Sequence, residues 1–263
     1  MTPIPFFQVD VAADRPFQGN PAAVMPLDRW LPDAVMQAIA AENNLSETAF
    51  TIPCASGEAD FELRWFTPEA EVDMCGHATL ASGHVMMRGD RATFLTRAGV
   101  LGVARDAHDE TMLRLDLPAG RLREDDVPGL AAALGVAEQP AWLADGCNDS
   151  AILLLGSEEA VRAVSPDFAA LRAIPHMAIV TAPGRDQAIA SRVFVPYLGI
   201  DEDPVTGSAH AALVPYWAER LGRNRFTALQ ASRRSGVFDC ELRGDRVILG
   251  ARCVTVIEGH FQL

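Results

Sequence analysis

The sequence predicts an α+β fold of two pseudo-symmetric domains, each a mixed or antiparallel β-sheet curled around a central apolar helix. The first observation is an internal repeat. Residues 64–68 (RWFTP) and 75–81 (CGHATLA) are matched by residues 192–196 (RVFVP) and 206–212 (TGSAHAA). The offset is 128 residues at the strand and 131 at the glycine, which is the size of a domain. The second observation is that each glycine begins an uncharged run of small and apolar residues, typical of a buried helix.

The repeat divides the 263 residues into two domains. We expect the first at residues 1–117 and the second at residues 118–263, because Pro118-Ala119-Gly120 has the composition of a linker. Both halves fall within the usual size range of domains. A return of the last few residues to the first domain stays open.

The first half is predicted to consist of short strands and two helices. The helix at 32–43 has Pro32 in its first turn and apolar residues at helical intervals. The helix at 76–88 carries no charge before Arg88, so it has no polar face and is expected to be buried. The strands are expected at residues 5–12, 22–25, 45–53, 60–67, 92–95, 99–105 and 111–117.

The second half repeats this plan. A helix is expected near residues 127–134 and another from Gly207, with strands near 141–145, 150–155, 177–181, 191–196, 226, 237 and 247–256. Two such halves facing each other would bring both glycine-started helices to an interdomain cleft. We therefore predict the active-site cleft between the halves, where pockets commonly occur.

The composition is that of an ordinary globular protein, with 49% hydrophobic and 22% charged residues. The formal net charge of −13 argues against nucleic acid as a partner, because phosphate contacts need clustered Lys or Arg. An anionic substrate would have to be attracted by local peptide dipoles rather than by the global field.

The cysteines and the N-terminal residues indicate the compartment. The sequence has five cysteines, an odd number: Cys54, Cys75, Cys147, Cys240 and Cys253. They are widely spaced and form no CxxC motif, which indicates a reducing compartment. No basic region followed by an apolar one begins the chain. We expect a cytoplasmic protein. The longest aliphatic run, residues 151–155, is too short to span a membrane.

The two predicted helix starts are the first candidate sites. The peptide N–H groups after Gly76 and Gly207 have no helical acceptor, so they attract anions. His77 and Ser208 follow the two glycines at equivalent places. Glu47 precedes an apolar strand, where partial desolvation would suit its carboxylate to proton transfer. The structural alternatives are a hydrogen-bonding histidine and a turn glutamate.

Three further residues lie close to the helix starts. Asp203 precedes Pro204 and can either cap the second helix or reach a substrate. Cys75 stands at a helix N-terminus, which favours a reactive thiolate of lowered pKa, but its counterpart in the repeat is Thr206. The sequence contains neither HExxH nor paired cysteines, and we predict no metal site.

Four motifs in order give the sequence a family resemblance: residues 19–24 (GNPAAV), 44–50 (NLSETAF), 75–81 (CGHATLA) and 201–210 (DEDPVTGSAH). Together they resemble the PhzF family of phenazine-biosynthesis-like proteins, over essentially the whole chain. This family belongs to the diaminopimelate-epimerase-like superfamily, whose fold has two pseudo-symmetric halves. The resemblance implies a homodimer and no cofactor.

The resemblance also implies an activity. The best understood member isomerises trans-2,3-dihydro-3-hydroxyanthranilate, and its proton-shuttling glutamate matches Glu47. His77 and Asp203 match other active-site positions and would orient and polarise the substrate. A small anionic metabolite is thus the expected ligand, and the substrate-binding positions are Ser46, Gly76, Gly207 and Ser208.

Two alternatives stay open. Related epimerases use two cysteines, whose positions correspond here to Cys75 and Thr206, and one thiol cannot carry out a two-thiol racemisation. A branch with one Cys and one Thr dehydrates hydroxyproline, so a hydroxy-acid dehydratase is the first alternative. A non-catalytic metabolite-binding protein is the second. The sequence does not identify the substrate.

Overall fold

The computed structural model describes residues 3–145 and 149–263. The contacts between residues divide the chain into two compact units: Met1–Asp116 with Gly250–Leu263, and Leu117–Leu249. The chain therefore enters the second unit at Leu117 and returns to the first within its last strand. Cys147 lies outside the described residues. Each unit combines strands with helices, as the predicted α+β fold requires.

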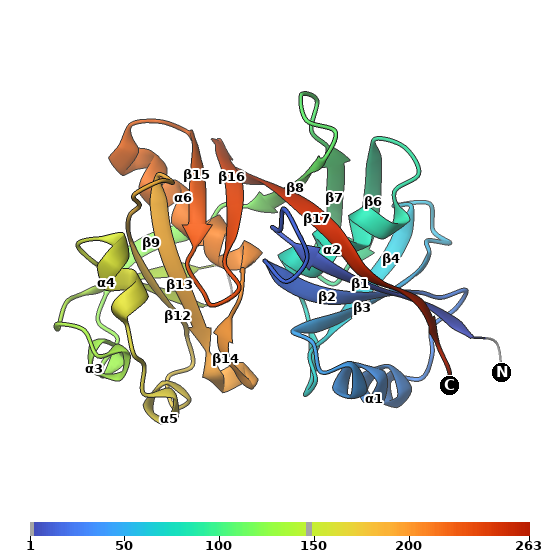
Figure 1. The fold of residues 1–263 in the computed structure, drawn as a ribbon, viewed down its shortest axis with the longest axis horizontal. Coiled ribbons are helices and arrows are strands. Elements are labelled where there is room, and N and C mark those ends of the chain that lie inside the picture. The colour runs from blue at the N-terminus through green and yellow to red at the C-terminus, as the bar shows by residue number, and fades with distance from the viewer. Residues whose placement is uncertain (1–2, 146–148) are drawn as a thin grey trace. The chain divides into compact units, whose positions relative to one another are not determined.

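The strands of the first unit close into a ring around one helix (Figure 1). Hydrogen-bonded neighbours follow the order β17–β1–β2–β3–β4–β6–β7–β8, and β8 pairs with β17 again. The helix α2 (Gly76–Met86) packs against β1, β2, β3, β6 and β7. The strands are β1 (Ile4–Val11), β2 (Asn20–Pro26), β3 (Glu47–Pro53), β4 (Phe61–Phe66), β5 (Glu71–Val72), β6 (Arg91–Thr96), β7 (Gly99–Arg105), β8 (Met112–Pro118) and β17 (Arg246–Phe261).

The helix α2 is the central rod that its composition predicts. Every residue from Gly76 to Gly83 is buried. Gly83 lets the helix approach β7 closely, because a Cβ atom added there would lie 2.4 Å from Cγ1 of Val103. The other helix, α1 (Asp33–Asn43), covers the outside of the strands, with Met36, Ile39 and Ala40 buried against Phe50 and Phe66.

The second unit has a sheet of its own. Its strands follow the order β9–β10–β11–β12–β13–β15–β16, and β14 pairs with β13. The long helix α6 (Gly207–Leu221) packs against β9 and β16. The strands are β9 (Arg121–Asp125), β10 (Ala141–Asp145), β11 (Ser150–Leu154), β12 (Met177–Pro183), β13 (Ile189–Val195), β14 (Ile200–Asp203), β15 (Arg225–Gln230) and β16 (Gly236–Arg243).

Three short helices, α3 (Leu130–Leu134), α4 (Glu158–Ala163) and α5 (Phe168–Leu171), contribute to the core of the second unit. The sequence predicts α3 but not α4 or α5, since six and four residues are too few to show a helical period. The residues before these two helices are the sequence signal for them, because both are good N-caps. The Ser157 hydroxyl accepts a hydrogen bond from the Ala160 N–H, and the Asp167 carboxylate accepts one from the Ala170 N–H.

The sequence repeat has the same structure in both units. In the first unit Arg64, on β4, makes a bidentate ion pair with Glu71 on β5. In the second unit Arg192, on β13, makes the same pair with Glu202 on β14. Each arginine also lies over a phenylalanine two residues further along its strand. Paired guanidinium and carboxylate groups therefore hold the hairpin before each glycine-started helix.

The expected linker at Pro118–Gly120 is a tight connection. Pro118 ends β8, and β9 begins at Arg121. The Ala119 N–H donates to the Asp245 carbonyl, and the Gly120 N–H donates to the Ala211 carbonyl. Backbone hydrogen bonding therefore orders the two residues between the strands.

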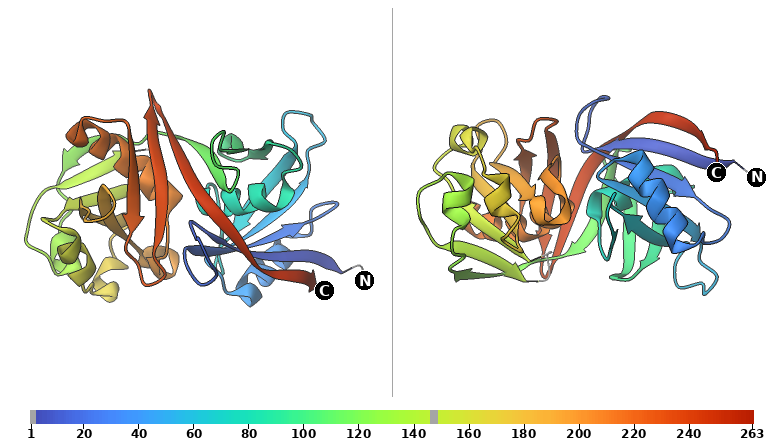
Figure 2. Two further views of the ribbon diagram at one scale, coloured as in Figure 1. Left: turned by 45° about the horizontal axis from the view of Figure 1, so that its top comes forward. Right: turned by 90° about the horizontal axis from the view of Figure 1, so that it is seen from below.

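Both chain ends belong to the first unit (Figure 2), where β1 and β17 pair antiparallel with Ile4 opposite Phe261.

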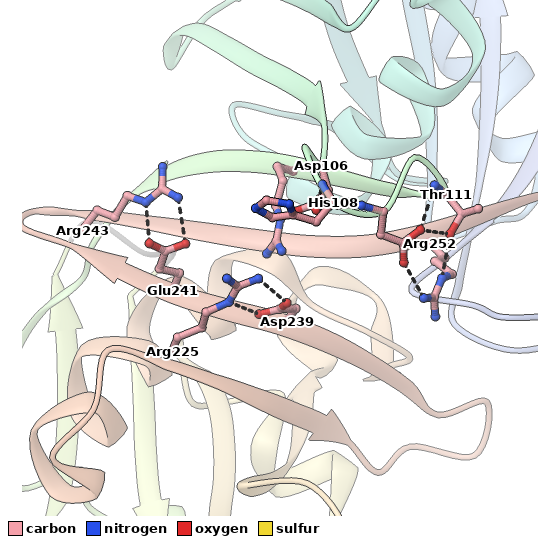
Figure 3. A network of polar contacts seen from close by, with 10 residues as sticks. Asp106, His108, Thr111, Arg225, Asp239, Glu241, Arg243 and Arg252 are labelled. Carbon is pink, nitrogen blue, oxygen red and sulfur yellow. Dashed lines mark hydrogen bonds and ion pairs between the residues drawn. The ribbon is translucent and has the colours of Figure 1, made fainter.

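Exposed ion pairs lie on both units (Figure 3). Arg252 in the first unit donates to Thr111 and Asp109, whereas the second unit has the pairs Arg225–Asp239 and Arg243–Glu241. Such surface pairs are screened by solvent and contribute little to stability. Among the described helices, none has the length and apolar character to span a membrane.

Gly19, directly before β2, is predicted to be essential for stability. Its φ is +65°, and a Cβ atom there would lie 1.9 Å from the Val11 carbonyl oxygen. Gly19→Ala should therefore lower the free energy of unfolding by more than ~2 kcal/mol, measured by chemical denaturation. Gly57→Ala is the control, because φ is +78° and no atom lies within 4 Å of the added Cβ. Equal losses in the two variants would show that the backbone clash is unimportant.

Candidate active site

Three elements of the first unit bring polar side chains together at one end of α2. Asn20 begins β2, Glu47 begins the parallel neighbour β3, and Ala22 stands opposite Glu47 in the register. Cys75 is the N-cap residue of α2, and His77 lies in its first turn. The ring of strands thus places the predicted glutamate and histidine side by side.

Glu47 and His77 form the closest charged contact of this cluster. Nε2 of His77 lies 3.0 Å from Oε2 of Glu47, and the side chains are 4% and 13% exposed, respectively. The distance suits an ion pair, yet neither atom has a hydrogen-bond partner of acceptable geometry among the described residues. A carboxylate oxygen and a ring nitrogen are therefore close together but not committed to an aligned hydrogen bond.

The opposite nitrogen of the His77 ring faces two other side chains. Nδ2 of Asn20 lies 3.3 Å from Nδ1, and Sγ of Cys75 lies 3.5 Å from the same atom. The Ser46 hydroxyl donates to Oδ1 of Asn20 at 2.9 Å. Asn20 is fully buried. Sequence reasoning places Asn20 in a family motif without assigning it a role, since its contact with His77 spans 57 residues of sequence.

The charges in this cluster shift two pKa values. Burial opposes the imidazolium form of His77, but Cys75 and the Glu47 carboxylate favour it and, acting by themselves, would raise the pKa of His77 well above its usual value. Burial, followed by the Glu47 charge, raises the pKa of the Cys75 thiol. The expectation of a reactive thiolate at Cys75 is therefore wrong, because desolvation and a nearby carboxylate outweigh the helix N-terminus.

The donor atoms of Glu47, Cys75 and His77 lie within 4.8 Å of one another, close enough to suggest a metal ion. However, the carboxylate faces Nε2 of the ring, whereas the thiol faces Nδ1. The closest contacts of the carboxylate and the thiol are therefore to different nitrogens of the ring. The geometry suits proton transfer better.

The predicted residues of the second unit form a separate cluster at the start of α6. Asp203 ends β14, and Thr206 is the N-cap of α6. The Thr206 hydroxyl donates to Oδ2 of Asp203 at 2.5 Å. Gly207 and Ser208 form the first buried residues of the helix. Asp203, Thr206, Gly207 and Ser208 are therefore neighbours, as their spacing predicts.

Gln230, on β15, holds this loop and was missed by sequence reasoning. Its Nε2 donates to the Asp203 carbonyl at 2.7 Å and lies 3.1 Å from Oγ1 of Thr206. Its Oε1 accepts from the Thr206 N–H at 2.8 Å. A single glutamine in a predicted strand has no pattern that signals such a contact, so only the fold identifies it.

His210 belongs to the same helix start but has a different environment from His77. Its Nδ1 donates to the Thr206 carbonyl at 2.8 Å, while Nε2 is buried without a hydrogen-bond partner among the residues described. Burial lowers the pKa of His210 to about 4, the Thr206 carbonyl opposing this only in part. His210 is therefore a neutral, structural histidine at physiological pH.

This pKa makes stability depend on pH. The unfolded state binds a proton below about 6.5 and the folded state only below about 4, so stability contributed by neutral His210 falls as the pH drops through this interval. The loss should be about 3 kcal/mol in total. His210→Asn, which keeps a donor near the Nδ1 position, should flatten the decline in unfolding free energy between pH 7 and 4.5. The control His108→Asn, at an exposed position, should leave this decline unchanged. Equal pH slopes of the unfolding free energy in the two variants would contradict the role of buried His210.

Comparisons with known proteins agree with this fold. The family model described as phenazine biosynthesis-like protein matches residues 9–259. An uncharacterized isomerase of Pseudomonas aeruginosa is 46% identical over 264 residues, covering 98% of each chain. The crystal structure of a PhzF family protein of Enterococcus faecalis superimposes with a TM-score of 0.89 at 42% identity, covering 100% of both chains.

A more distant structure shares only the fold. A hydroxyproline epimerase of Agrobacterium vitis matches with a TM-score of 0.63 at 12% identity, over 98% of this chain and 90% of that one. This chain is therefore an α+β protein with an epimerase-like fold. The chain belongs to the phenazine biosynthesis-like, or PhzF, family, and the similar protein of Pseudomonas aeruginosa is named an uncharacterized isomerase.

Proposed function

We propose that this protein is a cofactor-independent isomerase that moves a proton between two carbons of a small, carboxylated, cyclic metabolite. Glu47 is the group that carries the proton. One observation supports this role above all: Oε2 of Glu47 is buried 3.0 Å from Nε2 of His77 without an aligned hydrogen bond to any described residue. A structural carboxylate would be expected to have its hydrogen bonds satisfied within the fold.

The reaction divides into two proton transfers. In the first, a C–H bond next to an unsaturated system breaks, the proton binds Glu47, and the electron pair enters the conjugated system. In the second, Glu47 returns the proton to another carbon, and the double bonds shift. Atoms and electrons balance without a redox partner. His77 steadies the Glu47 carboxylate and polarises the substrate from the first turn of α2.

The substrate carboxylate is proposed to bind the peptide N–H groups at the start of α2. Cys75, the N-cap residue, makes no side-chain hydrogen bond to these groups. The net charge of −13 means that such local dipoles must provide the attraction. Roles for Ser46, Gly76, Asp203, Gly207 and Ser208 in substrate contact, and the homodimer, stay predictions from the family resemblance.

The thiol-based alternative has less support. A dehydratase or epimerase using Cys75 and Thr206 needs both groups ready for proton transfer. Burial keeps the Cys75 thiol protonated by raising its pKa. The Thr206 hydroxyl is hydrogen-bonded to Asp203, with Gln230 against the same oxygen. We therefore favour the glutamate.

Solvent-deuterium exchange tests the proposed function. The purified protein is incubated in heavy water with dihydro-hydroxyanthranilate, diaminopimelate and hydroxyproline, and deuterium incorporation is followed by NMR. Glu47→Gln should lower the exchange rate by at least ~100-fold, because it removes the base. Cys75→Ala should retain exchange.

Glu42→Gln, an exposed change on α1, is the matched control and should leave the rate unchanged. Loss of exchange in Cys75→Ala but not in Glu47→Gln would assign the protein to the thiol-based branch. Ligand binding without exchange, unaffected by Glu47→Gln, would indicate a non-catalytic metabolite-binding protein.

A further inference from the structure

We propose that Asn20, held by Ser46, is a positioning residue that keeps His77 neutral with its single ring proton on Nε2, facing Glu47. This inference deepens the proposed function and rests on it for its catalytic meaning. It also gives Ser46 a role within the protein, in addition to the substrate contact that the family resemblance implies.

The first argument is the rigid placement of Asn20. Gly19 precedes it with a φ of +65°, and the backbone of Val11 and Ala12 leaves no room for a Cβ atom there. Asn20 then pairs with Val11 as β2 begins, and its side chain is fully buried. Its amide group is therefore held in one place beside the His77 ring.

The second argument is the direction of the amide. The Ser46 hydroxyl donates to Oδ1 of Asn20 at 2.9 Å, which leaves Nδ2 facing Nδ1 of His77 at 3.3 Å. An amide nitrogen only donates, so Nδ1 must accept and cannot carry a proton. A neutral ring then has its proton on Nε2, 3.0 Å from the Glu47 carboxylate.

The third argument concerns the doubly protonated, imidazolium form of His77, which Asn20 disfavours. Besides Asn20, the groups facing the ring are the Glu47 carboxylate at Nε2 and the Cys75 thiol at Nδ1. The carboxylate favours an imidazolium, whose charge would hold Glu47 in an ion pair and make it a weaker base. An imidazolium would also direct its Nδ1 proton at the Asn20 amide protons. Asn20 thus counteracts full protonation and preserves the basicity of Glu47.

Nitrogen NMR of the intact protein tests this arrangement. With ¹⁵N-labelled histidine, the His77 ring at neutral pH should show one protonated nitrogen, Nε2, and one unprotonated nitrogen, Nδ1. Asn20→Asp presents only acceptor atoms at the same place, so both ring nitrogens should become protonated. The same variant should lose at least ~10-fold in kcat with a smaller change in KM, because its histidine is in the wrong protonation state.

Two further variants complete the test. Ser46→Ala removes the hydrogen bond that orients the amide and should shift the His77 nitrogens in the same direction as Asn20→Asp. Asn224→Asp, an exposed change of the same kind, should alter neither the spectrum nor turnover. A doubly protonated His77 in the unaltered protein, or a proton on Nδ1, would overturn the inference.

The NMR result also separates this inference from the proposed function. The predicted tautomer together with no exchange on any substrate would uphold the Asn20 contact and reject the isomerase. Exchange that depends on Glu47 together with an imidazolium at His77 would reject the role of Asn20 and retain the isomerase.

Discussion

The contact between Glu47 and His77 is the interaction on which the site depends. It exists because α2 is buried from Gly76 to Gly83 within the ring of strands in the first unit, so that His77 lies beside the start of β3, where Glu47 begins the strand. Burial makes the contact electrostatically strong, since little water screens it. The same burial raises the pKa of the Cys75 thiol.

The repeat supplies two similar frameworks with different chemistry. Arg64 and Arg192 hold matching hairpins, and a glycine-started helix follows each. The first helix start has an acid–base pair beside it. The second has a hydrogen-bonded loop in which Gln230 ties Asp203 to Thr206. Divergence of the two frameworks therefore shows in the residues around each helix start rather than in the backbone plan.

The repeat and the uncharged run after Gly76 were enough to predict the α+β plan and the buried rod, because both follow from local composition. The family resemblance assigned Glu47 and His77 to one active site but did not predict their direct contact, which the structure shows. Gln230 and the role of Asn20 were beyond sequence reasoning, since each depends on partners far along the chain. The pKa of Cys75 was wrongly predicted, because the burial of its side chain cannot be read from the helix start alone.

The central claim is that one carboxylate both removes and returns the proton, and a label-transfer experiment tests it most directly. The first substrate that shows Glu47-dependent exchange would be deuterated at the carbon that loses its proton and converted in ordinary water for a single turnover. A buried single base should deliver part of the deuterium to the new carbon of the product. Complete loss of the label to water, with no product carrying it, would contradict a shielded Glu47 shuttle and favour two separate acid–base groups.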